Sequence, residues 1–303
     1  MAISAKDVKE LRELSGAGML DCKKALEETD GNVDEAVDVL RKKGLGKAAK
    51  KMDRLASEGL VGLKISDDNA VGVVCEINSE TDFVAKNDGF ISMVNEIAGH
   101  IFVNDFADVA VLNASNIDST VFSEYLANKT ALIGENLVMR RFTKNVAGSN
   151  ELVNGYLHVN GRIGVLLKAS YEGSDKTKAL ELLKSISMHA AAMAPKYLTA
   201  DETTQEALDK ETEIAKEELR ASGKPENIWD KILVGKMEKF KQENSLLGQA
   251  YVMDNKSTIE QVLANASKEM GNIKILQYTR YELGEGLEKK VDNFADEVAQ
   301  QLS

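Results

Sequence analysis

The sequence predicts an α+β fold in which helices alternate with small antiparallel sheets. Two stretches carry apolar residues at period two on either side of a short polar turn, which is the pattern of a β-hairpin. A helical stretch follows each hairpin. Only 2 of the 303 residues are proline, so long helices can run unbroken and a proline-rich linker is excluded. At roughly 150 residues per domain, this length allows about two domains.

Residues 4–44 predict three short helices with a small shared core. Ser4 and Asp7 have the spacing of a capping box at the start of the first helix. Glycines at 16 and 18 break that helix, and Asp30-Gly31 ends the second. The basic stretch 42–54 follows. We interpret it as a solvated connector that is at most partly helical, with contact to an acidic partner or RNA as the alternative.

The first hairpin is predicted at 60–65 and 71–77, around the polar turn 66–69. A helix with Phe90 and Ile101 at the ends of its apolar stripe follows. A further helix around 121–133 then leads to a strand at 137–142.

The same order of elements appears a second time. Strands at 156–159 and 163–167 flank Asn160-Gly161, the strongest short signal of a hairpin. A helix at 179–194 follows, and the last candidate strand is 275–281. Hairpin, helix and later single strand, twice over, predict two related halves, each with a small antiparallel sheet.

The second half carries an insert of different character at about 200–245. Two amphipathic stretches are joined at 222–225, where Gly223 suits a helix end and Pro225 a helix start. This pattern predicts a projecting antiparallel helical hairpin. The last segment, 286–303, predicts an amphipathic helix that packs on the body or docks on another molecule.

Charge and composition exclude several classes of protein. Asp and Glu outnumber Lys and Arg, 49 to 38, and the net charge of −11 argues against nucleic acid as the primary partner. No run of about 18 apolar residues is available to span a membrane. The amino terminus lacks the apolar core of a signal peptide, and two cysteines form no disulfide framework, so we expect a cytoplasmic location.

No set of catalytic, cofactor-binding or metal-binding residues is visible in the sequence. The glycine–lysine pairs lack the remaining residues of a phosphate loop, and the three histidines lack metal-ligand spacing. Cys22 and Cys75 lie in apolar stretches and are predicted to be buried thiols. We therefore expect neither an enzyme nor a cofactor, but a protein that acts through its surfaces.

The segment 79–87 joins the first hairpin to its helix and stands out from the rest. Ser79 and Asp82 have capping-box spacing, and Phe83 follows them directly. One interpretation is a capped helix with Phe83 turned into its own core. The other is an aromatic anchor beside a carboxylate, presented to a partner.

Two motifs resemble those of one known family. Residues 81–87 read TDFVAKN, and residues 11–26 read LRELSGAGMLDCKKAL. Both resemble signatures of bacterial elongation factor Ts, and shorter matches follow in the same order at 133–136, His158, 162–165 and 188–191.

The resemblance implies an architecture and a function. The architecture is a ubiquitin-associated-like (UBA-like) three-helix domain with its linker at 1–55, core subdomains at 56–148 and 149–285, and a terminal helical module at 286–303. The function is guanine nucleotide exchange on elongation factor Tu, the GTPase that delivers aminoacyl-tRNA. No membrane or direct nucleic-acid partner is expected.

The resemblance also implies which residues meet the GTPase. The segment that dislodges its magnesium would be Thr81, Asp82, Phe83 and Val84, with Phe83 as the intruding aromatic. Further contacts would come from Met19, Leu20, Ile133, Gly134, Glu135, Asn136 and His158.

Overall fold

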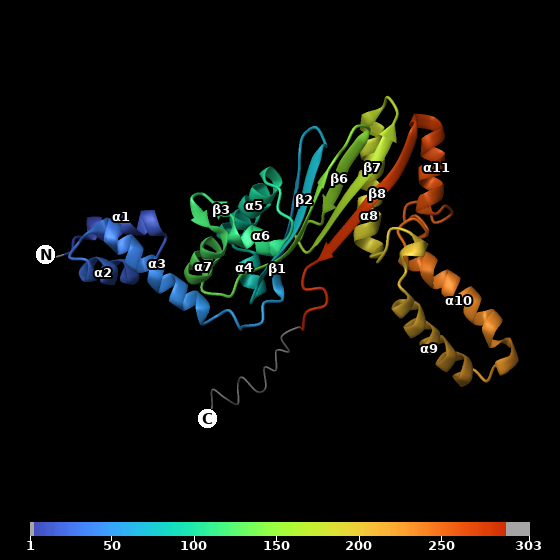
Figure 1. Ribbon diagram of the computed structural model, residues 1–303, viewed down its shortest axis with the longest axis horizontal. Helices are drawn as coiled ribbons and strands as arrows, with labels where there is room; N and C mark the ends of the chain where they lie inside the picture. Colours follow the sequence, from blue (N-terminus) through green and yellow to red (C-terminus); the bar gives the residue numbers. More distant parts are fainter. Residues whose placement is uncertain (1–2, 289–303) are drawn as a thin grey trace. The chain divides into compact units, whose positions relative to one another are not determined.

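The computed structural model describes residues 3–288 and confirms a mixed α+β fold with small antiparallel sheets (Figure 1). These residues form two compact units. The first comprises 3–62, 75–142 and 282–288, and the second comprises 63–74 and 143–281. The predicted domain boundaries and the UBA-like character of the first helices stay predictions.

The amino-terminal helices form as the sequence predicts, with one difference in length. They are α1 (Ala5–Ser15), α2 (Met19–Glu28) and α3 (Val33–Ala49), and the predicted capping box between Ser4 and Asp7 starts α1. The stretch 42–54, predicted to be a connector that is at most partly helical, is helical as far as Ala49, the end of α3, and only residues 50–54 connect onward. Buried Gly44 and Ala48 allow close packing on α7 (Phe122–Ile133), where Ala131 lies beside Gly44.

The first hairpin and a later strand form one sheet in the order β1-β2-β5. The long helix α5 supports it and buries apolar residues from Phe90 to Ile101, as predicted. The elements after the first three helices are β1 (Glu58–Ile65), β2 (Val71–Ser79), α4 (Asp82–Ala85), α5 (Asp88–Val103), α6 (Val109–Ala114), β3 (Asn116–Ile117), β4 (Thr120–Val121), α7 and β5 (Val138–Val146).

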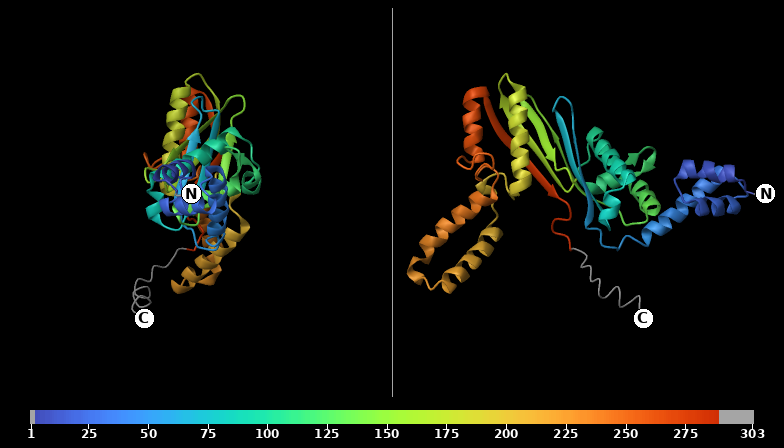
Figure 2. Two further views of the ribbon diagram at one scale, coloured as in Figure 1. Left: turned by 90° about the vertical axis from the view of Figure 1, so that its left-hand side faces the viewer. Right: turned by 180° about the vertical axis from the view of Figure 1, so that it is seen from behind.

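The second hairpin, β6 (Glu151–Leu157) and β7 (Ile163–Glu172), is antiparallel with Tyr156 opposite Val165. Helix α8 (Lys176–Met193) lies along one face of this sheet (Figure 2) and buries Leu183 and Ile186 in a shared core. Helix α11 (Ile259–Met270), which our sequence analysis missed, adds Ile259 and Leu263 to that core. The strand β8 (Asn272–Glu282) completes the order β6-β7-β8.

The two sheets share one topology. In each, the strands of a hairpin are neighbours, and the strand that comes later in the chain pairs beside the second hairpin strand. This confirms the predicted repetition of hairpin, helix and single strand.

The inserted helical hairpin is also confirmed. Helices α9 (Gln205–Ala221) and α10 (Trp229–Asn244) lie side by side, and Gly223 adopts φ of 66° in the turn between them. The short 3₁₀ turns Ala200–Glu202 and Glu226–Ile228 precede the two helices. Most of the predicted terminal helix, 289–303, lies outside the described residues.

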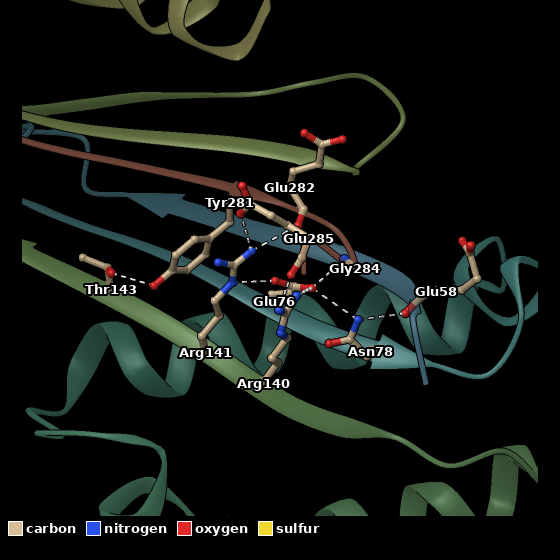
Figure 3. Close-up of polar contacts among 10 residues, drawn as sticks. All are labelled: Glu58, Glu76, Asn78, Arg140, Arg141, Thr143, Tyr281, Glu282, Gly284 and Glu285. Atoms are coloured by element: carbon tan, nitrogen blue, oxygen red, sulfur yellow. Dashed lines mark hydrogen bonds and ion pairs between the residues drawn. The ribbon is translucent and has the colours of Figure 1, made fainter. Parts of the chain in front are cut away.

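A buried carboxylate ties the last described segment to the rest of the first unit (Figure 3). Glu76 on β2 is fully buried and accepts hydrogen bonds from Arg140 Nη1 at 2.8 Å and Arg141 Nε at 2.6 Å, both on β5. It also accepts from the backbone N–H of Gly284 at 2.8 Å and from the Asn78 amide at 3.2 Å. The buried negative charge of Glu76 is therefore paired with two arginines, and both of its oxygens accept hydrogen bonds. A charge that is removed from water needs such partners.

Candidate protein interaction site

The corner between β2 and α4 differs in detail from the predicted capping box. Ser79 is the buried last residue of β2, and its hydroxyl donates to the carbonyl of Thr81 at 3.0 Å. Helix α4 instead begins after Thr81, which has the extended backbone of an N-cap residue. The predicted capping box between Ser79 and Asp82 was therefore wrong, because Ser79 belongs to β2 and Thr81 is the N-cap residue of α4.

Phe83 projects from this corner into solvent. Its side chain is 78% exposed, and none of the four residues of α4 is buried. Asp82 forms an ion pair with Lys86 at 2.7 Å, and Lys86 Nζ lies 5.9 Å from the centre of the Phe83 ring. The structure thus excludes the interpretation in which Phe83 belongs to its own core.

A carboxylate from a distant segment holds the corner in place. Glu135 Oε2 accepts from the backbone N–H groups of Glu80 at 3.1 Å and Thr81 at 3.0 Å. Glu135 Oε1 accepts from the Thr81 hydroxyl at 2.6 Å. The structure therefore joins two of the segments predicted to meet a partner, 81–84 and 133–136.

The segment 133–136 is itself anchored. Gly134 ends α7 with φ of 91°, a conformation that glycine adopts readily, and its carbonyl accepts from Lys51. The buried Asn136 amide donates to the carbonyls of Met52 at 3.2 Å and Arg54 at 2.8 Å. The connector after α3 thus supports the corner that carries Phe83.

Met19 and Leu20 lie in the first unit at the start of α2 and are 61% and 65% exposed. In the same unit, Leu14 and Leu132 line a cleft of about 860 Å³ between the first helices and α7. Lys47 hydrogen-bonds Asp21 at the edge of this cleft and lowers the pKa of that carboxyl. The exposed apolar side chains of α2 form a second candidate contact.

His158 belongs to the second unit, whereas the other predicted contact residues belong to the first. It lies at the turn between β6 and β7, where its Nδ1 is 3.0 Å from Asn160 Oδ1 and its backbone N–H donates to Ile163. The neighbouring Val159 is 94% exposed. The turn therefore presents the apolar side chain of Val159 to solvent, next to a half-buried His158.

The two cysteines are buried and free, as predicted. Burial raises the pKa of the Cys75 thiol to about 12, so this group stays protonated and unreactive near neutral pH. Residues 3–288 contain no cluster of three or more His, Cys, Asp or Glu side chains suited to a metal ion. In the same range, no helix is long and apolar enough to cross a bilayer.

Our sequence analysis missed several residues that build this surface. Glu80 Oε1 accepts from the backbone N–H of Asn136 at 2.6 Å and so completes the link between the two segments. Leu132 packs beside Gly16. Neither position shows a local signal in the sequence, because both act through contacts with residues far along the chain.

The chain thus combines an α+β fold with an aromatic ring held in solvent, the kind of side chain through which proteins can anchor a partner. The model of the family described as elongation factor Ts matches residues 80–285. The chain belongs to the elongation factor Ts family.

Relatives of that name match along the full chain. The elongation factor Ts of a Nitratiruptor species is 50% identical over 304 residues, covering 100% of both chains. Those of Campylobacter curvus and Helicobacter hepaticus are 46% and 44% identical, with coverage of 100% and 99% of both chains. The shared name places this chain among the elongation factors of protein biosynthesis.

Proposed function

We propose that this chain is a guanine nucleotide exchange factor that binds elongation factor Tu in its GDP-bound form and promotes release of GDP. Membership of the elongation factor Ts family supports the proposal. The observation that carries it is the 78% exposure of Phe83 on a corner fixed by Glu135. An exposed, fixed aromatic side chain is what a wedge into another protein requires.

Exchange of this kind needs no covalent chemistry. The factor must bind the nucleotide-free GTPase more tightly than the GDP-bound form. Linkage then requires GDP to weaken the binding of the factor by the same ratio as the factor weakens GDP. A protein can do this through its surfaces alone.

The segment Thr81–Val84 is the part that we assign to magnesium release. The magnesium ion of a GTPase holds the nucleotide phosphates and orders the switch loops. The Phe83 ring, inserted between helices beside that ion, would displace the groups that ligate it. Asp82 precedes the ring in the chain and is paired with Lys86 at 2.7 Å, so its carboxylate is held at the base of the wedge.

Phe83 alone is insufficient for a large acceleration. A ten-thousandfold faster release lowers the barrier by roughly 5.5 kcal/mol, at about 1.4 per decade. Burying one Phe side chain gives only about 1.5–3 kcal/mol. We therefore assign further contacts to Met19 and Leu20, to Ile133–Asn136 and to the His158 turn.

The remaining assignments follow from the same family resemblance. We assign the first three helices to a UBA-like domain at 1–55, followed by core subdomains at 56–148 and 149–285 and a terminal module at 286–303. The site of action is the cytoplasm, where the GTPase delivers aminoacyl-tRNA.

The test is release of a fluorescent GDP from elongation factor Tu, measured by stopped flow with and without this chain. We expect the release rate to rise by orders of magnitude as the concentration of the chain increases. A rate that does not change while the two proteins still form a complex would indicate a passive binding module and would contradict the proposal.

A further inference from the structure

The corner that carries Phe83 is too short to hold its own shape. Helix α4 has four residues, well below the length at which a helix is stable by itself in water. Its N-cap residue Thr81 directs its hydroxyl to Glu135 instead of to the first turn of the helix. The position of Phe83 must therefore be fixed by contacts from outside the helix.

Those contacts form a reciprocal pair of carboxylate–amide hydrogen bonds, which we call the Glu80–Glu135 clamp. Glu135 accepts from the backbone N–H groups of Glu80 and Thr81, 54 to 55 residues away along the chain. Glu80 accepts in return from the backbone N–H of Asn136 at 2.6 Å. Hydrogen bonds to a charged acceptor are among the stronger ones in proteins.

The clamp is attached to a third segment. Asn136 is 4% exposed and donates to the carbonyls of Met52 and Arg54, and Arg54 forms an ion pair with Glu80 at 3.4 Å. The end of β2, the end of α7 and the connector after α3 thus meet at one point. Phe83 lies two residues beyond it and has its ring in water.

We propose that Glu135 is a positioning residue for nucleotide exchange, acting within this chain to hold the 80–81 backbone so that Phe83 projects. This inference rests on the proposed function of Phe83. It differs from the assignment of Glu135 as a partner contact, because here its carboxylate is already bound by three donors of its own chain. Without the clamp, the four-residue helix frays and the ring samples many directions, so fewer encounters insert it.

Two substitutions at Glu135 separate a positioning role from a charge that acts on the partner. Glu135→Ala removes every acceptor, and we expect GDP release to slow by about tenfold. Glu135→Gln keeps an amide oxygen that accepts from both backbone N–H groups, while the Thr81 hydroxyl can turn to accept from the new NH₂. We therefore expect the Gln variant to stay within about threefold of the unaltered chain.

Hydrogen exchange measures the clamp directly and without the partner. In Glu135→Ala, the amides of Glu80 and Thr81 should exchange at least about tenfold faster, since the loss of a charged acceptor exposes them. The matched control is Glu202→Ala in the second unit, which removes a carboxylate that accepts from the Leu198 N–H at 2.9 Å. That variant should leave both the exchange of residues 80–81 and GDP release unchanged.

A double-variant cycle tests whether Glu135 acts through Phe83. In a Phe83→Ala background, we expect Glu135→Ala to slow GDP release by less than about twofold, because the ring that it positions is gone. If Glu135→Ala fails to give a cooperative melt, Thr81→Val replaces it in the cycle. That variant deletes only the hydroxyl donor, and we expect release to slow by about fivefold.

The outcomes are distinct. Equal losses in the Ala and Gln variants, or a full additional loss in the Phe83→Ala background, would show that the Glu135 charge acts on the partner and would overturn the inference. Unchanged amide exchange or unchanged release in Glu135→Ala would overturn it as well. In all of these cases, slow GDP release in the presence of the Phe83→Ala variant would still support the proposed function. Normal release by Phe83→Ala would instead refute the wedge itself.

Discussion

At the scale of single residues, exposed side chains are the candidates for binding a partner, whereas buried side chains stabilise the fold. Phe83 keeps its ring in water, although burial of an aromatic side chain is favourable. His189 is the opposite case, since it is fully buried in the second unit. Its Nδ1 accepts from the Val252 N–H at 3.2 Å, so Nε2 carries the proton that is donated to Gln249 at 3.0 Å.

This environment predicts how stability depends on pH. Burial lowers the pKa of His189, despite the opposing hydrogen bond to Gln249. The unfolded chain therefore binds more protons than the folded chain below the unfolded value of about 6.5. The stabilising effect is complete above that pH and is lost as the pH falls toward the folded pKa, by up to about 1.4 kcal/mol per pH unit.

Urea unfolding between about pH 8 and pH 5.5 measures this dependence. His189→Gln removes the titrating group, so the free energy of unfolding of this variant should depend less steeply on pH. His100, whose pKa burial also lowers, accounts for a remaining slope of the same sign. An identical pH dependence in the His189→Gln variant would contradict the expectation.

At the scale of elements, buried charge links strands that are far apart in the sequence. Glu76 on β2 pairs with two arginines of β5 and with the backbone of Gly284. Glu76→Gln leaves two arginines next to a neutral group. We expect the free energy of unfolding to fall by about 3 kcal/mol, the usual effect of breaking a buried pair from one side.

Glu285→Gln is the matched control for this prediction. It removes a carboxylate that lies 3.2 Å from Arg141 but is 52% exposed, so we expect a loss below about 1 kcal/mol. Chemical denaturation of both variants provides the comparison. A loss in Glu76→Gln no greater than in Glu285→Gln would show that burial does not strengthen this cluster.

Elements with strong local signals were predictable from the sequence. The Asn160-Gly161 turn predicted the second β-hairpin. The helix end at Gly223 and the helix start at Pro225 predicted the helical hairpin. The continuation of α3 to Ala49 was missed because it depends on packing against α7. Helix α11 was missed although its sequence signals it, since Thr258 and Gln261 form a capping box and Ile259, Leu263 and Ala266 recur at helical spacing.

In the candidate site, too, local motifs were predictable and long-range contacts were not. Segments 81–84 and 133–136 were predicted from motifs, but their joining by Glu135 was not, because the bond spans 54 residues and leaves no local pattern. Nor does the sequence decide the exposure of Phe83. A phenylalanine that follows a strand can be buried or exposed. The backbone conformation of the corner determines whether its ring points into the core or into solvent.

At the scale of the whole molecule, we expect the inserted helical hairpin to be separable from the core of the second unit. The core cluster of the second unit contains residues of β6, β7, α8, α11 and β8, and, within the described residues, none from α9 or α10. Replacing residues 205–242 by a short glycine–serine linker should therefore leave a cooperative melt within a few degrees of the original.

The contrasting variant is Leu183→Ala, which empties a fully buried position of that core and should cost about 2–5 kcal/mol. Thermal unfolding followed by circular dichroism compares the two. Loss of the cooperative transition on removing the helical hairpin would show that it is an integral part of the second unit.

The account as a whole depends on the exposed ring at the β2–α4 corner, and Phe83→Ala tests it most directly. The matched control is Met253→Ala, since Met253 is also 78% exposed but lies outside every predicted contact. Stopped-flow release of fluorescent GDP from elongation factor Tu is the measurement. We predict release at least about tenfold slower with Phe83→Ala and unchanged with Met253→Ala. Equal rates for the two variants, with both folded, would contradict the account.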